Sequence, residues 1–239
     1  MVLVSTRNPL NIGAAARAMS NLGFSRLRVV NPYEASFREA RSAVGAAALL
    51  ENAKEYKTVA DAVADCSLVI GTTAAHNREL HQPLKLLPEA AATIRKRLKS
   101  GSVALLFGSE KRGLSNADFS HCHWLLHIPT RQEHLSMNLG QAVAICLYEL
   151  VRTGGNGKHT QPRAASDRIK VKPASAGELE RLTSLLLDAL RASGYLEQRL
   201  VAAKEEKLRR MVRRLNLSAD DAEVWLGMLR QIEWKLKQR

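Results

Sequence analysis

Short, almost continuously apolar runs recur through the first 150 residues of the chain. They cover residues 2–5, 27–30, 67–71, 103–107 and 124–128. Strands that are buried on both faces have this pattern, because neither face of such a strand meets water. Between the runs, apolar residues have helical spacing over residues 11–22, 87–98 and 138–152. The alternation predicts an α/β domain in which helices cover both faces of a mostly parallel sheet.

The pattern changes in the last part of the chain. Residues 154–173 are basic, rich in Gly and Pro, and almost free of large apolar side chains, which is typical of a linker. Beyond them, residues 178–193 place leucines on one face of a helix, and a second helix, predicted to begin near Leu196, has basic and apolar sides. Ser218 has the position of an N-cap before a third helix. The expected domains are a sheet domain over residues 1–153 and a small all-α domain over residues 174–239.

The chain is strongly basic. Its 36 Lys and Arg exceed its 23 Asp and Glu by 13. Residues 1–150 carry a net charge of +5, from 17 basic and 12 acidic side chains, and residues 151–239 carry +8, from 19 and 11. Basic surfaces gain free energy by displacing the counterions of a polyanion, so this charge favours a nucleic acid over a membrane as the partner.

We expect no membrane span, no disulfide and no metal site. No apolar run approaches the roughly 20 residues that cross a bilayer, and the first residues lack signal-peptide order, so we expect a cytoplasmic protein. The three cysteines are odd in number and never form C-x-x-C, which favours buried thiols. A cluster along one predicted strand suggests a metal site as the alternative, but four zinc ligands need to converge. Its members are His121, Cys122, His123 and His127.

Three stretches differ from ordinary sheet and helix sequence. In the first, NPLNIGAAARAM, Asn11, Gly13 and Arg17 are spaced N-x-G-x-x-x-R across a turn into a helix. The small residues there let a second backbone, a ligand or a partner subunit approach closely. An Ala-rich buried helix with one solvated Arg has the same pattern, so both interpretations stay open at this point.

The other two stretches each follow a predicted strand. In LLFGSEKRGLSN the strand ends at Gly108 and Glu110 follows, where ligands of parallel α/β sheets bind. The glycines match neither the dinucleotide nor the P-loop pattern. In HIPTRQEHLSMN a polar loop after Ile128 leads through Ser136 and Asn138 into a helix. The alternative is a plain turn in the first case and ordinary helix capping in the second.

Together, the three stretches resemble the SpoU/TrmH branch of the SPOUT methyltransferases, in order and in separation, over essentially all of residues 1–150. The matching positions are Asn11, Gly13 and Arg17; residues 107–114, as F-G-x-E-x-x-G-L; and Ile128, Pro129, Ser136, Asn138, Ala142, Tyr148 and Glu149. Within this branch the chain is most similar to the TrmJ-type tRNA (cytidine/uridine-2′-O)-methyltransferases, through NIGAAARAM, VVNP, GTTA and the basic helical tail. It departs mildly from the pattern at Met137, where Leu is common, and at Gly140, where a larger residue is usual.

The resemblance implies a fold, a reaction and a cofactor. The C-terminal part of the sheet domain would pass through a trefoil knot that holds S-adenosylmethionine. A homodimer would methylate ribose 2′-hydroxyl groups in tRNA, at anticodon-loop position 32. The cofactor-binding positions that carry over are Thr72, Thr73, Ala74, Gly108, Glu110, Ile128, Ser136, Met137 and Asn138.

The resemblance also makes Arg17 the catalytic candidate. A guanidinium with a pKa above about 12 is a poor base, so we expect Arg17 to hold a phosphate or the hydroxyl and to stabilise the developing alkoxide. Ser136 or a phosphate oxygen would accept the proton, and Asn11 would hold the turn of the first stretch. A solvated helix face is the alternative to RNA contact for the basic tail. The expected RNA contacts are Arg17, Arg209, Arg210, Arg213 and Arg214.

Two other functions remain open. An rRNA 2′-O-methyltransferase of the same branch would share all three stretches. A non-catalytic RNA-binding protein of this fold would often have lost Arg17 or the pair Ser136 and Asn138, and all three are present.

Overall fold

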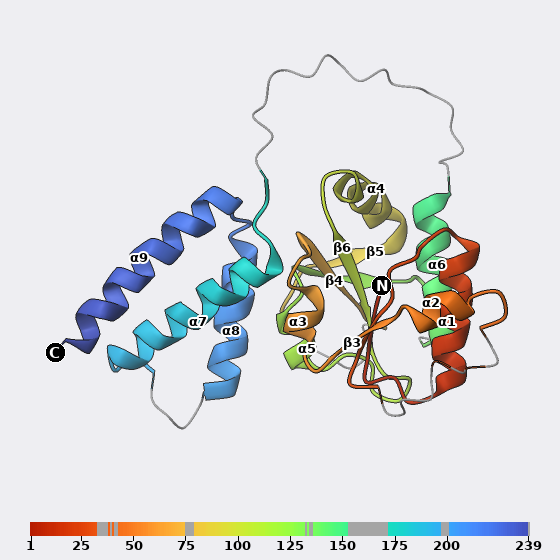
Figure 1. Cartoon of the computed structure of the whole chain (residues 1–239), viewed down its shortest axis with the longest axis horizontal. Coiled ribbons are helices and arrows are strands. Elements are labelled where there is room, and N and C mark those ends of the chain that lie inside the picture. Colours follow the sequence, from red (N-terminus) through yellow and green to blue (C-terminus); the bar gives the residue numbers. More distant parts are fainter. Residues whose placement is uncertain are drawn as a thin grey trace, which may run out of the picture.

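The computed structural model of the chain contains a sheet domain and a helical bundle that lies beside it (Figure 1). The structure describes residues 1–32, 38, 40, 43–74, 79–131, 133, 136–152, 172–196 and 201–238. Nearly all of the predicted linker, 154–173, therefore lies outside the described residues, as do residues 197–200 of the predicted second tail helix.

A seven-stranded, fully parallel sheet forms the centre of the first domain, in the order β3-β2-β1-β6-β4-β7-β5. The strands are β1 Val2–Val4, β2 Arg28–Val30, β3 Lys54–Tyr56, β4 Leu68–Thr72, β5 Leu84–Leu86, β6 Val103–Phe107 and β7 Trp124–His127. The five apolar runs are all strands, which confirms the prediction. The strands β3 and β5 were not predicted, because each is a three-residue edge strand with polar positions.

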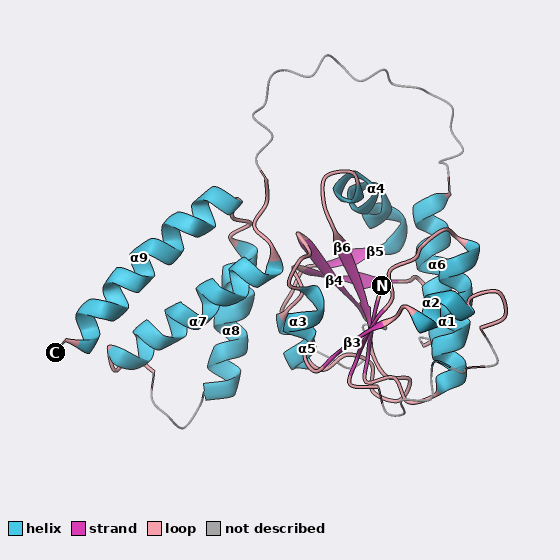
Figure 2. Cartoon of the chain, viewed as in Figure 1, coloured by secondary structure: helices cyan, strands magenta, loops and turns pink. Residues whose placement is uncertain are grey.

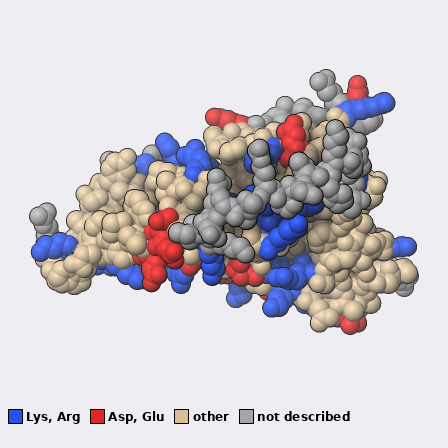
Figure 3. Space-filling model, turned by 90° about the horizontal axis from the view of Figure 1, so that it is seen from above, with Lys and Arg blue, Asp and Glu red and all other residues tan. Residues whose placement is uncertain are grey.

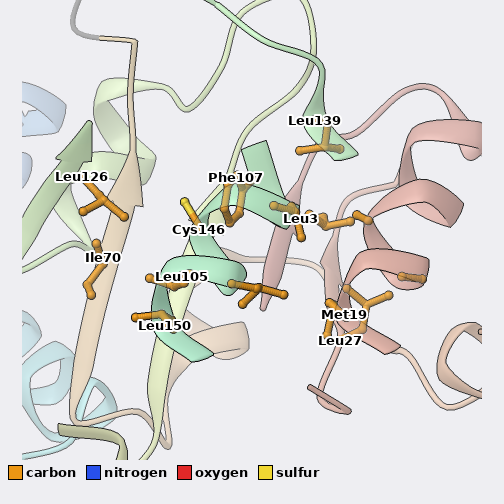
Figure 4. Close-up of a cluster of buried hydrophobic side chains, with 14 of the residues drawn as sticks. Leu3, Met19, Leu27, Ile70, Leu105, Phe107, Leu126, Leu139, Cys146 and Leu150 are labelled. Carbon is orange, nitrogen blue, oxygen red and sulfur yellow. The ribbon is translucent and has the colours of Figure 1, made fainter. Parts of the chain in front are cut away.

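Helices cover both faces of this sheet, as predicted (Figure 2). They are α1 Pro9–Asn21, α2 Ala47–Glu51, α3 Val59–Val63, α4 Leu87–Leu98, α5 Asn116–Ser120 and α6 Leu139–Val151. The helices α1, α2, α4 and α6 pack on one face, where the core contains Met19 of α1, Leu150 of α6 and Leu3 of β1 (Figure 4). The helices α3 and α5 pack on the other face, which buries Val2 and Val4 of the same strand. Because successive side chains of a strand point to opposite faces of the sheet, the core has two layers.

The knot that the resemblance implies stays a prediction. The strand order is consistent with it, because β7, although it follows β6 in sequence, lies between β4 and β5.

The tail forms three helices, α7 Ala176–Ala192, α8 Val201–Arg214 and α9 Ala219–Lys237. Ser218 caps α9 by accepting a hydrogen bond from the backbone of Asp221, as predicted, and Ser175 forms a capping box with Glu178 at the start of α7. The bundle has its own small apolar core. The helices of the tail lie in the part of the chain where the amphipathic pattern predicts them.

The bundle is docked on the α3/α5 face of the sheet domain. The backbone N–H groups of Ala176 and Gly177 donate to the carbonyl oxygens of Cys66 and Ala64, at 2.8 and 2.9 Å. A Cβ on Gly177 would meet the Ala64 oxygen at 3.0 Å, so the two backbones approach closely. The tail is thus a separate helical unit that is fixed against the sheet domain.

A buried ionic cluster completes this contact. Glu180 of α7 accepts hydrogen bonds from Arg209 and Arg213 of α8, at 3.0 Å each. Arg213 also donates to the backbone oxygen of His121, at 3.0 Å, and Arg209 to the hydroxyl of Ser120, at 3.3 Å. Burial alone would raise the pKa of Glu180, but the two guanidinium groups lower it. The cluster therefore consists of charged groups that hold the bundle to the end of α5.

Candidate active site

A cavity of about 450 Å³ lies at the carboxyl ends of β4, β6 and β7. Ligands of open parallel sheets bind at this edge. Eight of the nine predicted cofactor-binding residues line the cavity, and Asn138 does not. The eight are Thr72, Thr73, Ala74, Gly108, Glu110, Ile128, Ser136 and Met137.

The loop after β6 is tightly folded. A Cβ on Gly108 would lie 2.0 Å from the carbonyl carbon of Gly113 and 2.2 Å from the nitrogen of Leu114, so only glycine fits this position. Gly113 has φ +65°, and its N–H donates to the oxygen of Ser109 at 2.8 Å. The loop therefore turns back on itself and forms one wall of the cavity.

Hydrogen bonds join all three sequence stretches. The side-chain amide of Asn11 donates to Glu110 at 2.9 Å, and the side-chain amide of Asn138 donates to Asn11 at 2.9 Å. The backbone N–H groups of Arg7 and Asn8 also donate to Glu110. Burial favours the neutral form of Glu110, but these hydrogen bonds outweigh it and lower its pKa. Glu110 is thus a charged centre on which the first and second stretches meet.

Asn138 and Asn11 serve as positioning residues in this arrangement. Asn138 is the N-cap of α6 and accepts a hydrogen bond from the N–H of Gly140 at 2.9 Å. A Cβ on Gly140 would come within 2.8 Å of the Ala14 side chain, so the glycine lets α6 approach α1 closely. The small residues of the first stretch therefore serve helix packing, one of the functions left open by the sequence.

The loop after β4 is held by its neighbours. Thr72 donates from its hydroxyl to the oxygen of Leu106 at 2.8 Å, and the N–H of Thr73 donates to the oxygen of Leu126 at 3.0 Å. His127 Nδ1 lies 3.1 Å from the oxygen of Thr73. The predicted residues 72–74 therefore form a fixed rim of the cavity.

Thr130 and Phe119 are among the lining residues that the sequence analysis did not name as part of the site. Thr130 lines the cavity, and its buried hydroxyl has no hydrogen-bond partner among the described residues. Such an orphaned group favours a ligand that supplies a partner. Thr130 follows Pro129 at a strand end, so its place in the third stretch was the available signal. Phe119 also lines the cavity, but it lies on the short helix α5, for which the sequence gives no motif.

Arg17 lies outside the cavity. Its side chain is exposed on α1 and lines an open, mostly apolar hollow of about 790 Å³ between α1 and α6. Asn138 lines the same hollow, and the preceding Met137 lines the cavity, so the two spaces adjoin. Ile145 and Tyr148 of α6 are 40% and 57% exposed there. Of the predicted catalytic residues, Ser136 therefore lines the cavity, Arg17 lines the hollow, and Asn11 lines neither.

The four basic residues predicted to contact RNA on α8 have different environments. Arg209 and Arg213 are 9% and 1% exposed and are engaged by Glu180, so this structure leaves them no surface to offer RNA. Arg210 is partly buried and pairs with Glu206 at 3.5 Å. Arg214 alone of the four is exposed. The prediction that Arg209 and Arg213 contact RNA is therefore corrected: both residues hold the bundle together, because Glu180 of α7 faces them.

The His and Cys residues of β7 and its flanks do not converge. His123 accepts a hydrogen bond from the N–H of Val69 at 3.1 Å, whereas His127 faces Thr73 and His121 faces Glu180. In the described part of the chain, no group of three or more His, Cys, Asp or Glu residues is placed to hold a metal ion.

The three cysteines are free and buried, as predicted. Burial raises the pKa of Cys66 to about 11 and that of Cys146 to about 12, which makes both thiols poor nucleophiles. Among the described helices, none is both long and apolar enough to cross a membrane.

Comparisons with known proteins agree with this geometry. A family model described as the SpoU rRNA Methylase family matches residues 1–148. The tRNA (cytidine/uridine-2′-O-)-methyltransferase TrmJ of Sodalis glossinidius is 35% identical over 234 residues, covering 98% of this chain and 90% of the relative. The tRNA (cytidine/uridine/adenosine-2′-O-)-methyltransferase TrmJ of Pseudomonas aeruginosa is 34% identical, covering 98% and 93%. The crystal structure of TrmJ from Z. mobilis superposes with a TM-score of 0.84 and 30% identity, covering 97% of each chain.

Proposed function

The chain belongs to the SpoU rRNA Methylase family, and from this premise we propose that it is an S-adenosylmethionine-dependent tRNA (cytidine/uridine-2′-O-)-methyltransferase. The observation that carries the proposal is the junction of the three stretches, in which Glu110, Asn11 and Asn138 are linked by hydrogen bonds beside one cavity. The similarity to tRNA methyltransferases extends over the tail as well, since it covers 98% of this chain. This full-length match favours tRNA over rRNA as the substrate.

The cavity fits the cofactor. Its volume lies in the range of roughly 300–1,000 Å³ that is usual for small-molecule sites. Apolar side chains of Leu126, Ile128 and Phe107 offer surfaces for a flat base, and the orphaned Thr130 hydroxyl offers a hydrogen bond. When bound, S-adenosylmethionine supplies an electrophilic methyl group on a sulfonium sulfur. The predicted loops 72–74, 108–110 and 136–138 would hold it.

The residues of the chain orient the ribose and help to remove its proton. Ser136 is exposed at the mouth of the cavity, where its hydroxyl can accept a hydrogen bond from the 2′-hydroxyl and relay the proton to a phosphate oxygen of the RNA. The guanidinium of Arg17 stabilises the oxygen as negative charge develops on it. Asn11 acts through Glu110 and Asn138 by fixing the loops. Alignment of the reacting atoms is the main contribution of this site.

The position of Arg17 favours a homodimer. The hollow between α1 and α6 is mostly apolar, and Tyr148 and Ile145 are exposed on it. A second copy that covers this face would place Arg17 at the subunit contact, next to the segment that contains Ser136. The catalytic set would then be completed only in the assembled enzyme.

The tail contributes RNA contacts through its exposed basic residues, of which Arg214 is the one that carries over from the sequence prediction. We place the target at anticodon-loop position 32 and the reaction in the cytoplasm, where tRNA is matured.

The test is incubation of the purified chain with labelled S-adenosylmethionine and, in parallel, total tRNA or rRNA. Nucleoside mass spectrometry should find 2′-O-methylated cytidine or uridine in tRNA. Arg17→Ala should lower turnover at saturating substrates and leave cofactor affinity unchanged. Methylation confined to rRNA would support the related rRNA enzyme, and cofactor binding without transfer to either RNA would contradict the proposal.

A further inference from the structure

A second cavity, of about 460 Å³, lies where the helical bundle meets the sheet domain. It is lined by Leu68 and Trp124, the first residues of β4 and β7, and by Arg214 and Leu217 of the tail. Thr72, at the other end of β4, lines the cofactor cavity. Four residue steps along a strand span about 13 Å. The two cavities therefore lie at opposite ends of the strands of the same sheet.

The interdomain cavity is cationic. Lys85 of β5, Arg97 of α4 and Arg214 of α8 line it, and within the described residues none of the three forms an ion pair. No Asp or Glu is among the described residues that line it. Figure 3 shows Lys and Arg side chains along the junction of the two domains, with Asp and Glu side chains among them. The cavity thus combines a concave shape with charge of one sign.

The remaining polar groups of the cavity leave this charge uncompensated. The Lys85 ammonium lies over the ring of Trp124, 4.6 Å from its centroid, which fixes the cation without neutralising it. Arg213 also lines the cavity, but its charge is balanced by Glu180. His123 accepts a hydrogen bond from Val69 with Nδ1, and burial lowers its pKa to about 4, so it is neutral. Three like charges around one space repel each other, and an anion between them relieves this repulsion.

We propose that Lys85, Arg97 and Arg214 form a binding site for a backbone phosphate of the RNA substrate. A planar guanidinium binds phosphate oxygens in pairs, and two of the three cations are arginines. The site rests on the proposed function in one respect, namely that RNA is the substrate. The site lies at the amino ends of the strands, whereas the cofactor cavity lies at their carboxyl ends. It therefore holds a nucleotide other than the one that is methylated. It also requires both domains, since Arg214 comes from the docked bundle.

The test compares two triple variants of the full-length chain. Lys85→Gln, Arg97→Gln and Arg214→Gln remove the charge, whereas Lys85→Arg, Arg97→Lys and Arg214→Lys keep it at the same positions. The neutral triple should weaken tRNA binding by roughly tenfold or more and should reduce the salt dependence of the dissociation constant. Turnover at saturating tRNA and the affinity for S-adenosylmethionine should stay at the level of the unmodified chain. The charge-conserving triple should keep the salt dependence of the unmodified chain and bind tRNA more tightly than the neutral triple, because its charges remain although the paired guanidinium contacts are lost.

Equal tRNA affinity and equal salt dependence in the neutral triple and the unmodified chain would overturn the proposal. Equal losses in both triples would also overturn it, because the effect would then follow from altered packing. If the unmodified chain binds tRNA but transfers no methyl group, the proposed function fails, and the comparison of binding still decides whether this cavity holds RNA.

Discussion

The side chain of Asn138 donates a hydrogen bond to Asn11 at 2.9 Å, although 127 residues separate them along the chain. Asn11 in turn donates to Glu110. This relationship joins the N-terminus of α6 to the first turns of α1 and to the loop that follows β6. Asn11 therefore links two segments that line the cavity, although Asn11 itself does not line it.

Asn11→Ala should weaken the binding of S-adenosylmethionine, because two hydrogen bonds that position the loops are lost. Each such bond contributes about 1 kcal/mol to stability, so folding should survive. Asn8→Ala is the matched control, since Asn8 caps the same helix by accepting from Leu10 but does not take part in the link to Asn138. Both variants should lose similar stability in urea, and calorimetry should detect weaker cofactor binding only for Asn11→Ala. Normal cofactor affinity in Asn11→Ala would show that the link has no role in the site.

Gly108→Ala should reduce cofactor affinity by roughly tenfold or more, since the new methyl group collides with backbone atoms and the loop must move. Gly23→Ala serves as the control. Gly23 has φ +78°, and a Cβ added there would meet no atom within 4 Å, so this change introduces backbone strain of roughly 1 kcal/mol without a collision. Titration calorimetry of both variants separates the two effects, and similar affinities in both would contradict the importance of the tight loop.

Replacement by Met should destabilise the protein strongly at Arg213 and hardly at all at the neighbouring Arg214. Arg213→Met leaves Glu180 with one guanidinium partner fewer in a buried cluster, and breaking a buried pair typically costs about 3–5 kcal/mol. Arg214→Met changes an exposed side chain and should alter stability by less than about 0.5 kcal/mol. Urea unfolding measures both. Equal stability of the two variants would show that the ionic cluster does not hold the bundle in place.

Stability should fall as the pH is lowered from about 6.5 towards 4. The pKa values of His121 and His123 are both lowered from 6.5 to about 4. Burial is the main cause, and repulsion from Arg213 is the second. Protonation therefore favours the unfolded chain, so the stability that these neutral imidazoles confer is complete above pH 6.5 and is lost as the pH falls through the folded pKa values. In a variant with His121→Asn and His123→Asn, the free energy of unfolding should depend less on pH between 6.5 and 5. An unchanged slope would assign the acid sensitivity to other groups.

Ile145→Asp should weaken the proposed homodimer, because it places a charge in the apolar hollow between α1 and α6. Val224→Asp is the control, since Val224 is 61% exposed on α9 and lies outside that hollow. Light scattering after gel filtration should give a lower mass for Ile145→Asp only. If the unmodified chain is a monomer at micromolar concentration, the assembly that brings Arg17 to the site is wrong.

The sequence determined the features that depend on neighbouring residues. The strand Val103–Phe107 and the helix Leu87–Leu98 have the predicted bounds, and Ser218 caps the last helix. A run of apolar residues, a helical period and a capping side chain are local signals, because each acts within a few residues. The resemblance also identified eight of the residues that line the cavity, and five of these lie in the three stretches themselves.

Only the tertiary structure decided which side chains share a surface. An amphipathic pattern marked Arg213 and Arg214 alike as basic, but Glu180, 33 residues before Arg213, draws that side chain into a buried cluster. Arg17 has the expected motif, yet the packing of α1 against α6 directs it to the hollow outside the cavity. In the cationic cavity, Arg214 of α8 joins Lys85 and Arg97, which lie far earlier in the chain on β5 and α4. Such contacts follow from how elements pack over long separations, and the energy of a charge depends on the neighbours that this packing supplies.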